Sequence, residues 1–270
     1  MKKTVKKRLK PTNFGYSTMP MPPPTFTITS YNIHKGMSPL GRKVMVDPIA
    51  KALKQLNSDI LCLQEVQGQN LKRVLKFNDF PKQPQHEWFG EYLQMLPNYG
   101  KNCQYPHGHH GNAILSRFAL YPKHNVNISV NRFERRGLLH CEIVLPNLRP
   151  ISVLNAHLNL LERDRTKQYQ AINDYIKHNI DPHAPLILAG DFNDWQQLSM
   201  DKLTKNLQLQ EVIQQKFGKL LPTFPARLPL LSLDRIYIKN LTVKQAWLHT
   251  GKPFDKLSDH LPISAKLAFI

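Results

Sequence analysis

Residues 186–195, LILAGDFNDW, decide how the rest of the chain is interpreted. An apolar run ends at Gly190, and Asp191, Asn193 and Asp194 follow within four positions. A short, continuous apolar run bounded by glycine and polar residues is typical of a strand covered on both faces. The polar end by itself is equally compatible with an ordinary turn. The stretch therefore predicts a buried strand whose chemical meaning depends on the segments that lie beside it.

Comparable strand patterns recur along the chain and are often consecutive. Residues 46–57 predict a helix in which Asp47 serves as N-cap and Pro48 lies in the first turn. Because strands outnumber helices, we expect an α/β (α+β) protein with antiparallel sheets covered by helices. Strands are expected at 25–33, 59–66, 112–117, 124–130, 137–145, 150–158, 185–192, 233–239 and 261–270, and further helical segments within 161–179 and 196–217.

The charge distribution points to polyanionic partners. The first ten residues, MKKTVKKRLK, carry six positive charges, and the remaining residues carry the other +12 of the net +18. A body this basic favours nucleic acid or an anionic membrane surface, although a solubility role would give the same composition. We interpret residues 1–24 as a flexible, basic, proline-rich tail and residues 25–270 as one catalytic domain.

The cysteines and the hydropathy bear on location. Three widely spaced cysteines fit neither a disulfide framework nor a zinc site, and a reducing interior suits them. No apolar run approaches the roughly 18 residues of a spanning helix, and the basic tail lacks the apolar core of a signal peptide. We expect a cytoplasmic monomer without a transmembrane segment, with attachment to a membrane surface as an alternative.

Polar residues recur at the ends of the expected strands. A carboxylate at the end of a buried strand is costly unless it is paired. One such residue alone is explained by a cap or a turn, but a set that converges would form an oxygen-rich site for Mg²⁺ or Mn²⁺. The set comprises Asn32, Glu65, His157, Asp191 with Asn193, Asp234, and Asp259 with His260.

Six segments, in this order, resemble the signature of the endonuclease/exonuclease/phosphatase superfamily, which includes pancreatic-type deoxyribonuclease. They are SYNIHKG (30–36), DILCLQEV (59–66), GNAILSR (111–117), LILAGDFND (186–194), LDRIYI (233–238) and LSDHLPI (257–263). The likeness is strongest to small uncharacterised bacterial members. It implies a four-layer sandwich of two packed, mixed, mostly antiparallel sheets flanked by helices.

The resemblance also implies roles for the polar set. Glu65 would be the principal metal ligand, with Asn32 and Asp259 near the ion. Asp191 would orient or activate water and Asn193 would donate a hydrogen bond to the phosphate. We expect these two to face the same way, because residues two apart in an extended chain do so. His260 would contact the scissile phosphate with its tautomer fixed by Asp234.

His157 places the chain with the deoxyribonuclease and sphingomyelinase branches, where a second histidine could protonate the leaving oxygen. No glutamate that would orient it is evident in the sequence. Asp194 is expected to cap a helix that begins near residue 195. Five residues are candidate substrate contacts, each with a structural explanation that is about as good: Lys35, His110, Asn112, Arg136 and Trp195.

Together these features predict a Mg²⁺- or Mn²⁺-dependent phosphodiesterase that uses in-line water attack. A nuclease acting on DNA or RNA is the leading hypothesis, because of His157 and the basic body. The alternatives are a phospholipid phosphodiesterase of sphingomyelinase type and a non-catalytic module that binds nucleic acid or a membrane on the same fold.

Overall fold

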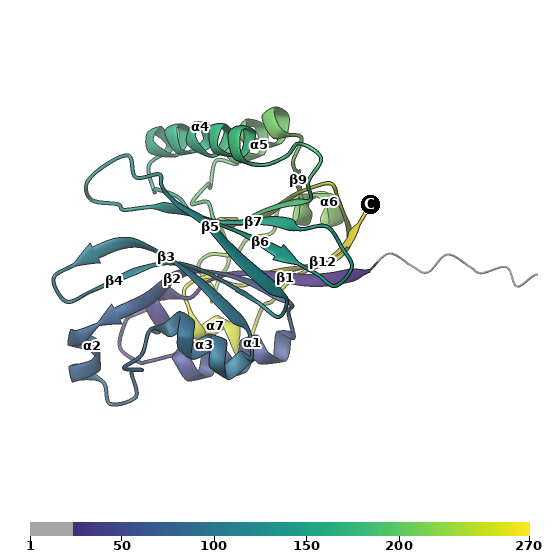
Figure 1. Ribbon diagram of the computed structural model, residues 1–270. Helices are drawn as coiled ribbons and strands as arrows, with labels where there is room; N and C mark the ends of the chain where they lie inside the picture. Colours follow the sequence, from purple (N-terminus) through teal and green to yellow (C-terminus); the bar gives the residue numbers. More distant parts are fainter. Residues whose placement is uncertain (1–23) are drawn as a thin grey trace, which may run out of the picture.

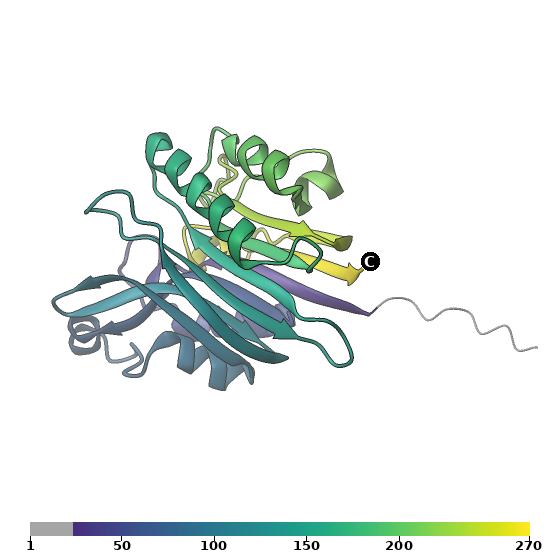
Figure 2. The same cartoon turned by 45° about the horizontal axis from the view of Figure 1, so that its top comes forward.

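The computed structural model describes residues 24–270, so the predicted basic tail lies, except for Pro24, outside the described residues. Two six-stranded sheets pack face to face, and helices cover both outer faces (Figure 1). Turning the molecule by 45° shows the same order of helices, sheet, sheet and helices (Figure 2). The predicted four-layer sandwich is confirmed.

Each sheet is assembled from strands that are distant in sequence. The first sheet has the order β11 (Leu241–Leu248), β12 (Ile263–Phe269), β1 (Thr25–Asn32), β2 (Ile60–Asn70), β4 (Gly108–Ser116) and β3 (Leu96–Tyr105). The second has the order β5 (Ala119–Asn127), β6 (Gly137–Val144), β7 (Ile151–His157), β8 (Leu186–Asp191), β10 (Asp234–Lys239) and β9 (Gln210–Glu211).

One parallel pair lies near the centre of each sheet. Strands β1 and β2 are parallel, β7 and β8 are parallel, and the other neighbours are antiparallel. A parallel pair needs a long crossover. The chain provides one through α1 (Val46–Leu56) and another through α4 (Glu162–Asn179). The polar residues that the sequence places near the ends of these strands therefore lie at the carboxyl ends of the two parallel pairs.

Three apolar clusters hold the layers together. One lies between the sheets and includes Ile28 and Cys62 from the first and Cys141 and Ile187 from the second. The others lie beneath the helices of either outer face. The side chains of Cys62 and Cys141 are both buried, as free thiols. Burial removes apolar surface from water on both faces of the central strands, which explains their nearly continuous apolar runs.

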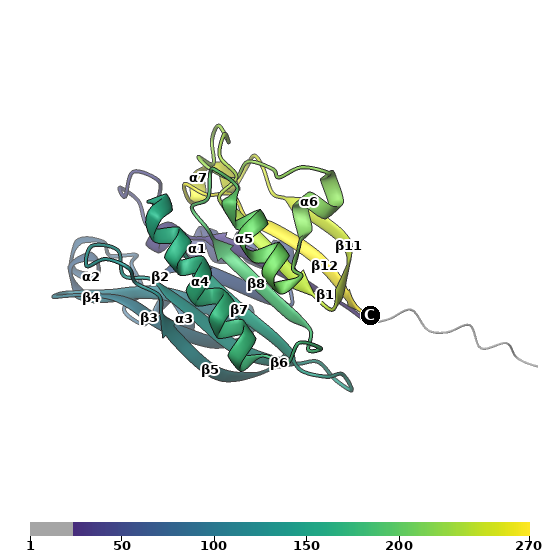
Figure 3. The same cartoon turned by 90° about the horizontal axis from the view of Figure 1, so that it is seen from above.

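The helices differ in what they cover. On the first sheet lie α1, α3 (Gln85–Leu93) and the short α7 (Phe254–Leu257), while α2 (Leu71–Lys76) follows the end of β2. The second sheet is covered by α4 and α5 (Leu198–Leu207), which run side by side in the view from above (Figure 3). Helix α6 (Val212–Phe217) contacts β10 and β11 at one end of the sandwich.

Some local expectations were wrong. Asp47 is not the N-cap of α1: Met45 holds that position, and the Asp47 carboxylate pairs with Lys51 at 2.7 Å. Strands β3 and β11 and helix α3 lack the alternation that would have predicted them. The helical stretch expected at 196–217 consists of two helices, α5 and α6, separated by β9. Within residues 24–270, no helix is both long enough and apolar enough to cross a bilayer.

Candidate active site

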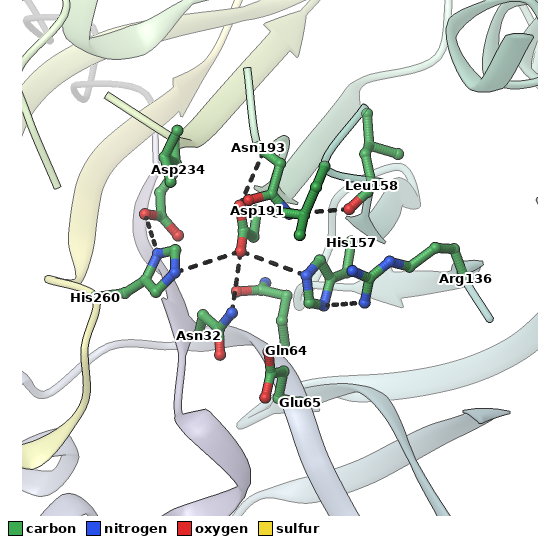
Figure 4. A network of polar contacts seen from close by, with 12 residues as sticks. Asn32, Gln64, Glu65, Arg136, His157, Leu158, Asp191, Asn193, Asp234 and His260 are labelled. Atoms are coloured by element: carbon green, nitrogen blue, oxygen red, sulfur yellow. Dashed lines mark hydrogen bonds and ion pairs between the residues drawn. The ribbon is translucent and has the colours of Figure 1, made fainter. Parts of the chain in front are cut away.

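Strand register places three of the predicted residues side by side. On adjacent strands, Asp191 of β8 lies opposite His157 of β7 and Asp234 of β10. Asn32 ends β1 in the facing sheet and reaches across to the same point (Figure 4). The site therefore lies where the carboxyl ends of both parallel pairs meet.

The Asp191 carboxylate is the centre of the cluster. Its Oδ2 accepts a hydrogen bond from Asn32 Nδ2 at 3.0 Å and lies 3.5 Å from His157 Nε2 and 3.6 Å from His260 Nε2. Asp191 is almost completely buried, and burial raises its pKa, as does the charge of Asp234, against the opposing effect of His260. A carboxylate with a raised pKa is better able to accept a proton near neutral pH.

His260 contacts carboxylates through both ring nitrogens. Its Nδ1 is 2.9 Å from Asp234 Oδ2, and its Nε2 faces Asp191. Burial lowers the pKa of this imidazole, but Asp234 and then Asp191 outweigh burial and raise the pKa to about 10. The structure therefore favours the imidazolium form of His260, which can donate a proton or hydrogen bond to an anionic group.

His157, in contrast to His260, is in the neutral form. Its Nδ1 lies 3.4 Å from Arg136 Nη1. Because a guanidinium has only donors, His157 Nδ1 must act as the acceptor, which leaves the proton on Nε2 facing Asp191. Burial and then the Arg136 charge lower the pKa of His157 well below its usual value. The neutral tautomer can donate a hydrogen bond but is a poor acid for a leaving group.

A glutamate, Glu134, is linked to His157 indirectly, through Arg136. Glu134 Oε1 accepts a hydrogen bond from Arg136 Nη2 at 2.9 Å, so the glutamate orients the arginine rather than the histidine. A series of contacts from Glu134 through Arg136 to His157 therefore takes the place of a direct glutamate–histidine contact. In the sequence, this arrangement is indicated by Glu134 and Arg136, which lie two residues apart in FERRG (133–137).

The extended geometry expected for Asp191 and Asn193 was wrong. The strand ends at Asp191, and Asn193 has a left-handed φ of 48°. The backbone N–H of Asn193 donates to Asp191 Oδ1 at 3.0 Å, and its side-chain amide donates to the Leu158 carbonyl at 2.9 Å. This turn folds Asn193 back over the carboxylate instead of projecting it beside Asp191.

Glu65 was expected at a strand end but lies inside β2, one residue beyond the parallel pairing with β1 and at an irregularity where its φ is 55°. Its carboxylate is paired with a cation. Its Oε2 lies 2.7 Å from the Lys35 ammonium. Burial opposes ionisation of this carboxyl, but the Lys35 ammonium lowers its pKa well below the usual range. The Lys35 backbone is fixed, because its carbonyl accepts hydrogen bonds from Arg73 and Gln85. Glu65 is thus ionised and already faces a cation.

The predicted metal ligands do not form the tightest cluster. Within the described residues, Asp191, Asp234 and His260 place ligand atoms within 4.8 Å of one another. Both ring nitrogens of His260 face carboxylates, while Asp234 Oδ1 is buried without a hydrogen-bond partner in the described part of the chain. The Glu65 Oε2 atom is also buried and has the Lys35 ammonium as its ion-pair partner. Its oxygen chemistry suits Mg²⁺ or Mn²⁺.

Asp259 lies beside a histidine that the sequence argument overlooked. Its Oδ2 is 3.2 Å from His34 Nδ1, and its Oδ1 accepts a hydrogen bond from Ser258 Oγ at 3.2 Å. The Ser258 hydroxyl also donates to the Asn32 carbonyl at 2.7 Å. These contacts join the loop before β12 to the end of β1.

Three remaining candidates have different environments. His110 is mostly buried in the charged neighbourhood of Lys35 and Glu65, and burial lowers its pKa to about 4. Asn112 is buried, and its amide is committed to the backbone carbonyls of Gly137 and Asn155, so it links the two sheets. The Trp195 ring is partly exposed and stacks on the Arg165 guanidinium at 4.5 Å, leaving one edge accessible.

Asp194 caps α5, which begins three residues later than expected. Its carboxylate accepts hydrogen bonds from the backbone N–H of Leu198 and Ser199, at 3.1 and 2.7 Å. The predicted helix-capping role of Asp194 is therefore present in the structure.

The model of the "Endonuclease/Exonuclease/phosphatase family" matches residues 29–260, which include every strand end described above. The chain belongs to this family. Its architecture and the buried acid–histidine cluster agree with that membership, and the family is one of phosphoric ester hydrolases.

A full-length relative supports the predicted likeness to small uncharacterised bacterial members. The chain is 35% identical over 244 residues to the Escherichia coli K12 protein "Uncharacterized protein YbhP", covering 90% of this chain and 96% of that one. The similarity thus extends over nearly the whole of both proteins.

Solved structures share the fold at low sequence identity. The endonuclease/exonuclease/phosphatase of Beutenbergia cavernae superposes with a TM-score of 0.73 at 19% identity, covering 91% of this chain and 72% of that one. TDP2 from D. rerio, in complex with a single-strand DNA product, has a TM-score of 0.63 at 17% identity, covering 90% and 98%. At these identities the likeness concerns the fold.

Proposed function

We propose that this protein is a divalent-metal-dependent phosphodiesterase that cleaves its substrate by in-line attack of water. The observation that supports this most directly is the buried Asp191 carboxylate between a charged His260 and a neutral His157. A carboxylate that accepts a proton and an imidazolium that stabilises an anion are the two groups that hydrolysis of a phosphate ester requires.

In the proposed reaction, Asp191 orients the attacking water and accepts its proton. His260, held by Asp234, donates to a non-bridging oxygen or to the leaving oxygen of the phosphate. The neutral His157 donates a second hydrogen bond through Nε2, and Arg136 supplies positive charge behind it. Lys35 lies within reach of the same anion. This assignment moves proton donation from His157 to His260.

Glu65, with Asn32 and Asp259 nearby, would hold the metal ion. When bound, Mg²⁺ or Mn²⁺ supplies positive charge that stabilises the phosphoryl oxygens during the reaction. The fit rests on the buried, ionised Glu65 carboxylate, whose present partner is the Lys35 ammonium.

Nucleic acid is the first substrate class that we propose, with DNA or RNA cleavage as the reaction. The support is the net charge of +18 and the histidine at position 157. Cleavage of a nucleic acid should fall steeply as salt rises, because each phosphate contact releases counterions.

A phospholipid phosphodiesterase is the second candidate. The observation that favours it is that the loop after Lys35 and the loop that leads into β10 expose leucines: Leu40, Leu228 and Leu230. Hydrolysis of a lipid phosphodiester would use the same Asp191 and His260 chemistry, with the substrate presented by a membrane surface.

A panel of phosphoesters with Mg²⁺ or Mn²⁺ tests the proposal: plasmid, abasic duplex, single strands, sphingomyelin, glycerophospholipids and inositol phosphates. We expect hydrolysis of at least one diester and its loss on chelation. Asp191→Ala and Glu65→Ala should reduce turnover at least about a hundredfold. Asp201→Ala, which removes an exposed acid on α5, should retain it.

Full metal-dependent activity in either site variant would rule out the assigned roles. Absence of turnover on every ester, together with metal-independent binding of nucleic acid or vesicles, would instead indicate a non-catalytic binding module.

A further inference from the structure

Two loops at the mouth of the site are attached directly to site residues. The first follows Lys35 and closes at a bridge between Met37 and Val44. The second closes at a bridge between Phe224 and Leu231 and leads into β10.

The second loop rests on the residues of the LSDHLP segment. The Phe224 ring lies 5.0 Å from the His260 ring, centroid to centroid. The Ala226 N–H donates to the Asp259 carbonyl at 2.8 Å. The tip of this loop is therefore held at a fixed place relative to the reacting groups.

The tips of both loops expose leucines to solvent. The exposed fractions are 76% for Leu40, 68% for Leu228 and 71% for Leu230. A single exposed leucine is ordinary on a protein surface. The two loops approach each other at Leu40 and Arg227, and exposed leucines on adjoining loops are typical of an interaction surface.

Basic residues lie beside Leu40, and Arg227 directly precedes Leu228 in the sequence. A cavity of about 430 Å³ lies between the two loops, lined by Leu40 and Met45 together with Arg42, Lys43, Arg227 and Lys256. No acidic residue lines it. We call Leu40, Arg42, Arg227, Leu228, Leu230 and Lys256 the leucine–basic rim.

We propose that the leucine–basic rim docks on an anionic phospholipid bilayer. Leucines next to cations match the two layers of a membrane interface, because apolar side chains enter the acyl boundary while lysine and arginine pair with lipid phosphates. A nucleic acid offers phosphates to the cations but no apolar phase for three exposed leucines. The rim thus fits a lipid surface better than a polynucleotide.

Docking would set the mouth of the site at the level of the lipid headgroups, since both loops begin or end at site residues. This step rests on the phosphodiesterase function proposed above, and for its second candidate substrate the orientation would present a phospholipid headgroup to Asp191 and His260. The docking itself needs neither metal nor turnover, so it is testable in Glu65→Ala protein with chelator present.

Vesicle co-sedimentation of the full chain tests the proposal, with phosphatidylcholine alone and with phosphatidylcholine containing 30% phosphatidylglycerol. We expect partition into the anionic vesicles only. Leu228→Ser with Leu230→Ser should reduce the partition coefficient about tenfold, because apolar area is lost from the acyl boundary. Leu40→Ser on the other loop should act in the same direction. Arg227→Glu with Lys256→Glu should abolish the preference for anionic lipid.

Leu96→Ser with Phe217→Ser is the matched control, because both side chains are exposed but lie outside the two loops. The basic tail is present in every variant and contributes equally to each. Unchanged partition in both leucine variants, with thermal midpoints equal to wild type, would overturn the proposal. So would loss of duplex DNA binding in the charge variant combined with no vesicle binding by wild type, which would assign the rim to nucleic acid.

Discussion

At the scale of single residues, the protonation state of each histidine follows from the atoms that face its ring. His260 faces two carboxylates and is charged, whereas His157 faces a guanidinium and is neutral. The same type of side chain thus has two different protonation states on either side of Asp191, and perturbed pKa values of this kind are common in acid–base sites.

Asp234→Asn tests the origin of the charge on His260. Asp234 is the largest influence raising that pKa, so its loss should lower the pKa from about 10 toward the ordinary histidine value. A raised folded-state pKa stabilises the fold fully below about pH 6.5, and this contribution disappears as pH rises through 10. In chelator, the wild-type thermal midpoint should fall more between pH 7.5 and 10 than that of the variant.

The same substitution should reduce turnover about a hundredfold, with the alkaline limb of the rate profile moved to lower pH. Asp201→Asn provides the control on an exposed carboxylate. An unchanged alkaline limb in Asp234→Asn would show that His260 does not act in its charged form.

At the scale of elements, side-chain caps explain where a helix begins, and buried contacts explain how it attaches to the sheet. The α5 helix begins where Asp194 accepts two backbone N–H groups, which would otherwise lack partners at a helix start. In the second sheet, a buried histidine, His140, contacts the Tyr175 hydroxyl of α4 at 2.8 Å and joins β6 to the helix above it.

Asp194→Ala should destabilise the protein by about 2 kcal/mol, because a helix cap is lost and buried N–H groups remain unsatisfied. Urea unfolding measures the change. Asp201→Ala, in the same helix but exposed, should shift stability by less than about 0.5 kcal/mol. Equal stability of the two variants would contradict the capping role, and specific activity of folded Asp194→Ala should stay close to wild type.

His140→Gln should make the protein less sensitive to acid. Burial lowers the pKa of His140 to about 4, so the unfolded chain takes up the proton first. Stability from the neutral form is present above about pH 6.5 and is lost as pH falls toward 4. Urea midpoints at pH 7 and 4.5 should differ less in the variant than in wild type, with exposed His178→Gln as control; an equal difference would refute the assignment.

At the scale of the whole molecule, polar contacts tie the sheets together next to the site. Asn155 of β7 donates to the carbonyls of Leu63 and Ala113 in the other sheet and accepts a hydrogen bond from Gln64. All of these atoms are buried, and Gln64 directly precedes Glu65. The distance between the two halves of the site therefore depends on this contact.

Asn155→Ala should lower the free energy of unfolding by about 3 kcal/mol, because buried polar groups on two strands lose their hydrogen-bond partner. Turnover should fall as well, since Glu65 and Asp191 approach from opposite sheets. Asn125→Ala is the matched control: this residue also bonds across the sheets, to the Lys101 carbonyl, but it is exposed and should cost less than about 1 kcal/mol. Equal losses in chemical denaturation would argue against the inter-sheet role.

Most strands and the polar residues near their ends were predictable from the chain, because hydrophobic periodicity and terminal polar residues are local properties. The four-layer sandwich was implied by the resemblance of the motifs to a known family. Edge strand β3 and helix α3 were missed because their exposed, mixed composition carries no strong period. The alternation of charge between His157 and His260 depends on Arg136 and Asp234, whose contacts arise from register between strands.

The sequence by itself determined the family, the layers and the residue types of the site. Tertiary structure decided which groups touch: the Lys35–Glu65 pair, the Glu134–Arg136–His157 series and the leucine–basic rim. The physical reason is that buried residues recur about every second position in a strand and about every fourth in a helix, so a short stretch of sequence is enough to reveal them. A pKa, a tautomer or a surface patch depends on distances of a few ångströms between segments that lie far apart in sequence.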